Sequence, residues 1–89
     1  MKKKDLLIEN KLGLHARAAA QIVKSASGYS SKIVFAKDGL EVDGKSIMGI
    51  MMLAAAKGTT VSLQVNGEDE ERAAEGIERL FKDKFGEKE

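Results

Sequence analysis

The chain has 89 residues, of which 43% are hydrophobic and 33% charged, and this balance indicates one globular domain over residues 1–89. The absence of cysteine excludes disulfide bonds, zinc–thiolate sites and thiol catalysis. A net charge of only +1, with three Phe and one Tyr, argues against a nucleic-acid binder, and no run is apolar enough for membrane insertion. A cytoplasmic protein is therefore expected.

The first secondary-structure elements are a strand at residues 3–8 and a helix that starts at Ala16. Apolar residues of this helix recur at i, i+3, i+4 and i+7, which predicts one buried face. Lys24 in the last turn and Gly28 after it are typical of a helix C-terminus. The apolar positions are Ala19, Ile22, Val23 and Ala26.

The middle of the chain predicts a hairpin, a short helix and a further strand. Residues 32–36 and 40–42 are β-rich and flank the turn Lys37-Asp38-Gly39. Ser46 is expected to be the N-cap of a helix at residues 47–53. Residues 60–65 alternate strictly between polar and apolar side chains, which indicates a half-buried strand.

The last helix is expected to open at residues 68–71, where four acidic residues favour the positive end of the helix dipole. Gly76 should cost roughly 1 kcal/mol relative to Ala unless close packing requires it. Residues from Lys84 onward are expected to be frayed. The predicted buried side chains are Ala73, Ala74, Ile77, Leu80 and Phe81, with Phe85 as a further candidate.

The resulting order is β-α-β-β-α-β-α, which predicts an α+β fold. We expect a two-layer open-faced sandwich in which a four-stranded antiparallel sheet carries three helices on one face.

The single histidine, His15, lies where a loop becomes a helix. Gly13 allows a tight turn, and the unpaired N–H groups of the first helical turn create an anion site at which Arg17 adds a guanidinium. Residues 1–49 hold nine Lys/Arg against five Asp/Glu, so this half suits phosphate or acidic partners. The hypothesis is a side chain that carries phosphate; the alternative is an ordinary cap or surface histidine.

Two motifs and the element order together resemble HPr, the histidine phosphocarrier family of the bacterial phosphoenolpyruvate-dependent phosphotransferase system. The motifs are Gly-Leu-His-Ala-Arg at 13–17 and Gly-Lys-Ser-Ile-Met-Gly-Ile-Met at 44–51. The resemblance implies that His15 accepts a phosphoryl group on Nδ1 from enzyme I and passes it to IIA domains in sugar uptake. It also implies that Arg17 and the backbone of Ala16 and Arg17 hold the phosphoryl group. Such a protein is a stoichiometric carrier rather than an enzyme, and needs no cofactor or metal.

Ser46 is a second candidate site, because the matching serine is phosphorylated by an ATP-dependent kinase in many relatives. The resemblance also implies a partner surface beside His15, on a protein expected to be monomeric. The residues of that surface are Ala20, Lys24, Ile47, Met48 and Met51. The alternative is that Ile47 and Met51 belong to the core.

The sequence also departs from the family pattern. Ala18 stands where the family usually has proline, Met52 where it often has serine and Ala54 where it often has glycine. Segments such as residues 10–13 resemble the nitrogen-branch paralogue NPr, so the branch stays open. A regulatory module read through Ser46 is an alternative. An acid–base enzyme is disfavoured because no Asp or Glu is expected to orient the His15 ring.

Overall fold

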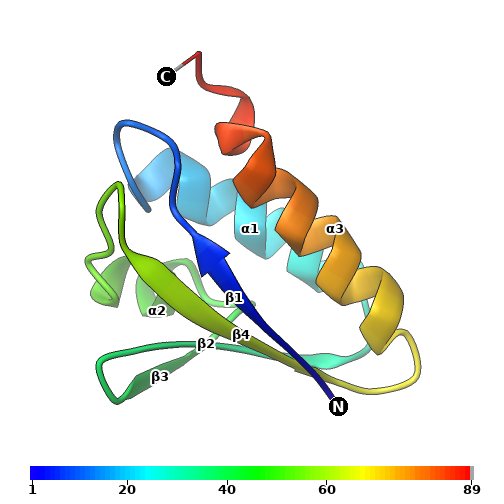
Figure 1. The fold of residues 1–89 in the computed structure, drawn as a ribbon. Helices are drawn as coiled ribbons and strands as arrows, with labels where there is room; N and C mark the ends of the chain where they lie inside the picture. Colours follow the sequence, from blue (N-terminus) through cyan, green and yellow to red (C-terminus); the bar gives the residue numbers. More distant parts are fainter. Residues whose placement is uncertain (89) are drawn as a thin grey trace.

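The computed structural model describes residues 1–88 and has the predicted α+β architecture (Figure 1). The element order is confirmed, with small shifts in the bounds: the first strand runs one residue ahead of the prediction at both ends, and the last helix begins later. The elements are β1 (Lys2–Leu7), α1 (Ala16–Ser27), β2 (Lys32–Lys37), β3 (Leu40–Asp43), α2 (Ile47–Met52), β4 (Thr60–Asn66), α3 (Glu70–Lys82) and a 3-10 turn, η1 (Lys84–Gly86).

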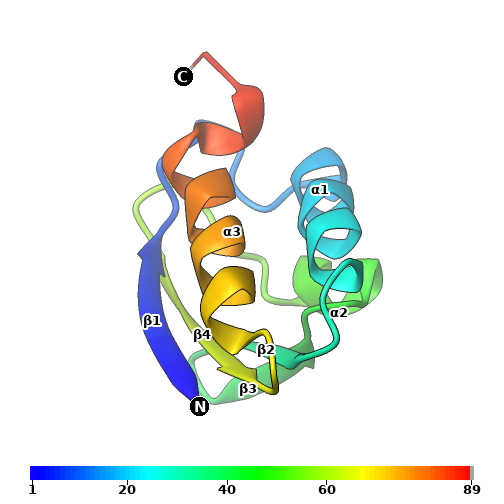
Figure 2. The ribbon, with the colours of Figure 1, turned by 90° about the vertical axis from the view of Figure 1, so that its right-hand side faces the viewer.

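The four strands form one antiparallel sheet in the order β1-β4-β2-β3. β4 lies between the first two strands of the sequence, and its alternating side chains Val61, Leu63 and Val65 are fully buried. Figure 2 shows the helices gathered on one side of the sheet, which leaves the other side open. The pattern that predicted β4 thus separates the core face from the solvent face.

The core fills the space between the sheet and the helices. The rings of Phe35 on β2 and Phe81 on α3 are stacked with their centroids 6.0 Å apart. Ala18 is fully buried although it was not among the residues assigned to the inner face of α1. Conversely, Leu80 was expected to be buried but is only partly buried and packs against the edge of the core. Among residues 1–88, no helix is both long and apolar enough to cross a membrane.

Close packing against Tyr29 explains why a glycine, Gly76, stands inside α3. A Cβ at this position would overlap the hydroxyl of Tyr29, which packs against the core from the segment after α1. The absence of a side chain therefore lets α3 approach Tyr29 closely, which offsets the poor helix propensity of glycine.

The chain after α3 packs against the rest of the molecule, and the expectation that residues from Lys84 are frayed was wrong for residues 84–87; residue 89 lies outside the described residues. Phe85 is 4% exposed, and its ring meets that of Phe81 edge-on. Lys84 and Phe85 both have left-handed backbone conformations, with φ of 55° and 54°. Such conformations cost non-glycine residues roughly 1–2 kcal/mol each and persist only where packing enforces them. Figure 1 shows that this turn lies at the same end of the molecule as the loop between β1 and α1.

Candidate phosphoryl-acceptor site

His15 is the N-cap residue of α1, as the sequence predicted. Its backbone is extended, with φ −73° and ψ 175°, and its carbonyl oxygen accepts a hydrogen bond from the Ala19 N–H at 2.9 Å. The imidazole makes no capping hydrogen bond, and 26% of the side chain is exposed. The ring therefore does not cap the helix, and reactants can reach it.

The loop before His15 is fixed by Gly13. Its φ is +66°, and a Cβ there would lie 2.6 Å from the carbonyl oxygen of Ala55. That same oxygen accepts a hydrogen bond from the Leu14 N–H at 2.9 Å. Only glycine combines this backbone conformation with this close approach. The loop thereby presents His15 in one orientation against the segment that follows α2.

The anion-binding groups lie in the first turn of α1. The N–H groups of Ala16, Arg17 and Ala18 have no backbone acceptor within residues 1–88, as the start of a helix requires. The Arg17 side chain is exposed and has no ion-pair partner within the same residues. Within residues 1–88, the donors predicted to hold a phosphoryl group thus have neither a backbone acceptor nor an ion-pair partner.

A carboxylate contacts the His15 ring, and the expectation that no acidic residue would do so was wrong. Glu87 Oε2 lies 2.8 Å from His15 Nε2 and accepts a second hydrogen bond, at 2.9 Å, from Asn10 Nδ2. The hydrogen bond from His15, followed by that from Asn10, holds the pKa of the Glu87 carboxyl below its ordinary value despite partial burial. Glu87 is therefore an ionised partner of the imidazole.

Asn10 links the loop to this carboxylate and was also missed. It is fully buried, and its Nδ2 donates to the Gly13 carbonyl oxygen at 2.8 Å as well as to Glu87. Its Oδ1 is the one buried side-chain polar atom without a partner in the described part of the chain. One sequence signal pointed toward the contact between Asn10 and Glu87. Phe85, an apolar residue beyond the helix end, was a candidate for the core, and its burial would anchor the segment that carries Glu87.

Ser46 caps α2 as predicted: its Oγ accepts a hydrogen bond from the Gly49 N–H at 3.0 Å. Only Ile50 and the C-cap Leu53 of this segment are buried. The reading that placed Ile47 and Met51 in the core was wrong, because each is 42% exposed. With Met48 at 76% and Met52 at 64%, they form an exposed apolar group, the α2 patch: Ile47, Met48, Met51 and Met52.

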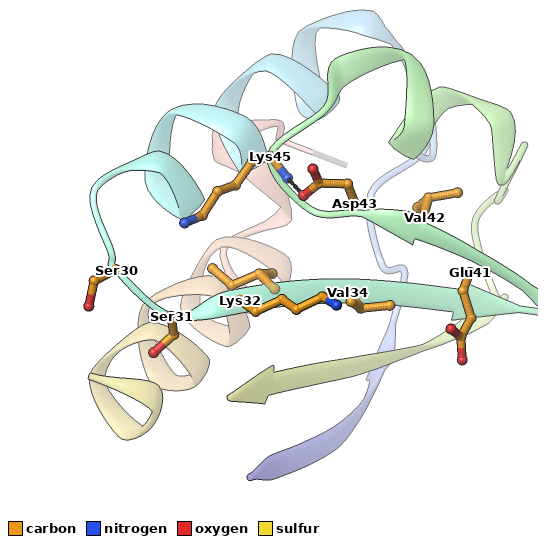
Figure 3. Close-up of a pocket in the computed structure, with 9 residues that line it drawn as sticks. Ser30, Ser31, Lys32, Val34, Glu41, Val42, Asp43 and Lys45 are labelled. Atoms are coloured by element: carbon orange, nitrogen blue, oxygen red, sulfur yellow. Dashed lines mark hydrogen bonds between the residues drawn. The ribbon is translucent and has the colours of Figure 1, made fainter. Parts of the chain in front are cut away.

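The remaining predicted partner residues lie on the neighbouring helix. α1 runs beside α2, and Ala20 and Lys24 are exposed on it (Figure 2). No predicted site residue lines the groove that Figure 3 shows at the start of β2 and the end of β3. In that groove Lys45 Nζ donates to the Tyr29 carbonyl oxygen at 2.9 Å. The groove residues are Ser30, Ser31, Lys32, Ile33, Val34, Glu41, Val42, Asp43 and Lys45.

An open-faced α+β sandwich that displays a histidine and free N–H donors at the start of its first helix suits a small protein that holds a phosphoryl group. Residues 2–83 match the family model described as the PTS HPr component phosphorylation site. The chain is 46% identical over 87 residues to phosphocarrier protein HPr of Cupriavidus necator, covering 98% of each chain. It is 48% identical over 84 residues to phosphocarrier protein HPr of Treponema pallidum, covering 94% of this chain and 96% of the relative.

The solved structures agree with these relatives. A crystal structure of HPr from Thermoanaerobacter tengcongensis superimposes with a TM-score of 0.96, at 47% identity and with both chains fully covered. The chain therefore belongs to the HPr family of phosphocarrier proteins of the phosphotransferase system.

Proposed function

We propose that this protein carries a phosphoryl group on Nδ1 of His15, received from enzyme I and delivered to IIA domains in sugar uptake. The observation that supports this most strongly is the combination, at one helix start, of an accessible imidazole with three backbone N–H groups that have no backbone acceptor among residues 1–88. Arg17 supplies an exposed guanidinium from the same turn. These groups stabilise the dianionic phosphoryl group and so favour the phosphorylated histidine over the unphosphorylated one.

The transfer itself needs only positioning and charge stabilisation. The lone pair of Nδ1 forms the new N–P bond as the bond between phosphorus and the donor atom of enzyme I breaks. The electron pair of the broken bond stays on the donor, so atoms and charge balance. Delivery to an acceptor is the same displacement with His15 as the leaving group. Stabilisation must stay moderate, because a carrier that binds its phosphoryl group too tightly cannot release it.

The α2 patch and the exposed residues Ala20 and Lys24 on α1 are proposed to receive both partners. Flexible methionine side chains adapt to different surfaces, which suits a carrier that must bind a donor and several acceptors in turn. The protein is proposed to be a monomer. Because HPr of Thermoanaerobacter tengcongensis has also been crystallised as a dimer, light scattering is the check on this proposal.

The test is phosphorylation with phosphoenolpyruvate and enzyme I, followed by intact mass measurement. We expect an acid-labile phosphoryl adduct on the wild-type protein and none on His15→Ala. An adduct that persists in His15→Ala, or none on the folded wild type with enzyme I of either branch, would overturn the proposal. Parallel reactions with sugar-branch and nitrogen-branch enzyme I assign the branch, and an NPr-like protein would react faster with the latter.

Ser46 is proposed as a regulatory phosphorylation site that acts through the same surface. Its hydroxyl caps α2 directly beside the α2 patch, so a phosphate there would change the charge at which partners dock without removing the helix. With ATP and an extract containing the kinase, we expect an acid-stable adduct that is absent in Ser46→Ala. An acid-stable adduct that survives this substitution would place the regulation elsewhere.

A further inference from the structure

We propose that Glu87 is a positioning residue that holds the proton of the neutral His15 ring on Nε2 and so leaves the lone pair on Nδ1. This inference rests on the proposed function and specifies how the reactive nitrogen is selected. The contact that carries it is the 2.8 Å separation between Glu87 Oε2 and His15 Nε2.

The direction of this hydrogen bond follows from chemistry. An ionised carboxylate can only accept, so Nε2 must carry the hydrogen that lies between the two atoms. A neutral imidazole has a single N–H group, and with that hydrogen on Nε2 the other nitrogen is unprotonated. Nδ1 is then the only nucleophilic nitrogen of the ring, because Nε2 is both protonated and covered by the carboxylate.

The carboxylate is itself held in place by a second donor. Asn10 Nδ2 donates to the same Oε2 at 2.9 Å. Asn10 is fully buried, so this donor is fixed relative to the loop that carries His15. Buried partners of this kind orient a reactive side chain more strictly than a solvent-exposed one can.

The backbone that carries Glu87 is anchored independently of His15. Phe85 is buried against Phe81, and its carbonyl oxygen accepts a hydrogen bond from Gln21 Nε2 on α1 at 3.1 Å. The left-handed conformations of Lys84 and Phe85 turn the chain back toward the start of that helix. Glu87 lies beyond residues 2–83, the part that matches the family model. The contact is therefore a property of how this chain continues after α3.

The charge of Glu87 also acts during transfer. When Nδ1 forms the N–P bond, the proton on Nε2 stays in place and the ring gains positive charge. Glu87 faces that charge at hydrogen-bond distance and stabilises it. Glu87 therefore assists acceptance of the phosphoryl group, and delivery relies on the proton that Nε2 keeps, because a cationic ring leaves Nδ1 as a neutral imidazole nitrogen.

The test compares wild type, Glu87→Ala, Glu87→Gln and the control Glu75→Gln. Glu75 is an exposed α3 residue, so its substitution removes one carboxylate charge away from His15. Histidine-specific 15N labelling reports which ring nitrogen is protonated and how fast the Nε2–H exchanges with water. Phosphoryl uptake from phospho-enzyme I is timed in the same samples by intact mass.

We expect a slowly exchanging Nε2–H in wild type and Glu75→Gln. In Glu87→Ala the exchange should be at least about tenfold faster and uptake roughly tenfold slower, as for loss of a partner that orients a reactive ring. Glu87→Gln should restore the slow exchange, because its amide oxygen still accepts, but only part of the rate, because the charge is lost.

Exchange and uptake in Glu87→Ala equal to those of wild type would overturn the role of Glu87. Failure of wild type itself to accept phosphoryl would overturn the proposed function instead, and the exchange measurement would still decide whether Glu87 holds the proton.

Discussion

The ring of Phe85 packs edge-on against the ring of Phe81, with 5.0 Å between their centroids. This contact joins the segment after α3 to the core and places Glu87 against His15. Packing of a single aromatic side chain thus supports an interaction at the surface of the molecule.

Replacement of this anchor should affect both stability and transfer. Phe85→Ala is expected to lower the free energy of unfolding by about 3 kcal/mol, as for other buried aromatic truncations. It should also slow phosphoryl uptake to the level of Glu87→Ala, because the carboxylate loses its support. Urea unfolding and timed phosphorylation measure the two effects. Phe85→Leu keeps most of the packing and is the control; unchanged uptake in Phe85→Ala would separate the anchor from the site.

Gly13 should be far less tolerant of alanine than Gly39, although both have a positive φ. At Gly39, with φ +84°, no heavy atom beyond the two adjoining residues lies within 4 Å of the position that a Cβ would occupy, so Gly39→Ala should cost only about 1 kcal/mol of backbone strain. At Gly13 the clash with the Ala55 carbonyl adds to that strain, and about 3 kcal/mol is expected. Chemical denaturation of the two variants checks the difference; equal losses would show that the loop relaxes without cost.

Ala18→Pro is expected to stabilise the protein by roughly 0.4–1 kcal/mol, because proline in the first helical turn restricts the unfolded chain. The Ala18 N–H has no backbone acceptor in the described part of the chain, so its removal breaks no hydrogen bond of the helix. Thermal unfolding measures the gain. Ala18→Gly is the opposite control and should destabilise; a loss of stability in Ala18→Pro would show that the fully buried site cannot accommodate the ring.

Asp69 should make stability fall in strong acid. Hydrogen bonds from the Ser31 hydroxyl, and then from the Ser30 N–H, lower the pKa of the Asp69 carboxyl from 3.8 to about 2. Because the folded-state value is the lower one, its contribution is complete above the unfolded value and is lost as pH falls from 3.8 toward about 2. The free energy of unfolding, measured with urea over this range, should change more steeply with pH in wild type than in Asp69→Asn; identical slopes would contradict the assignment.

The sequence predicted the fold well because most elements have a single buried face. In β4 the alternation of Val61, Leu63 and Val65 matches the two faces of an open sheet, and a slip by one residue would bury polar side chains. The start of α1 and the cap at Ser46 were predictable for a similar reason, since local hydrogen bonding favours particular residue types there.

The partner of His15 could not be predicted in this way. His15 and Glu87 are 72 positions apart, and no local pattern connects them. Their contact depends on left-handed conformations at Lys84 and Phe85, residue types that disfavour them. It forms because tertiary packing of Phe85 overrides local preference, and that packing is visible only once α1 and α3 are placed in space.

The strand order has a consequence for how the protein is made. β4 pairs with both β1 and β2, so β1 has no neighbour in the sheet until residues 60–66 are synthesised. Before then the ladder between β2 and β3 is the only one that can close among the described strands. His15 needs still later parts of the chain, including Glu87. His15 thus acquires its full surroundings only when the chain through residue 87 has left the ribosome, so shorter nascent chains cannot present the finished site.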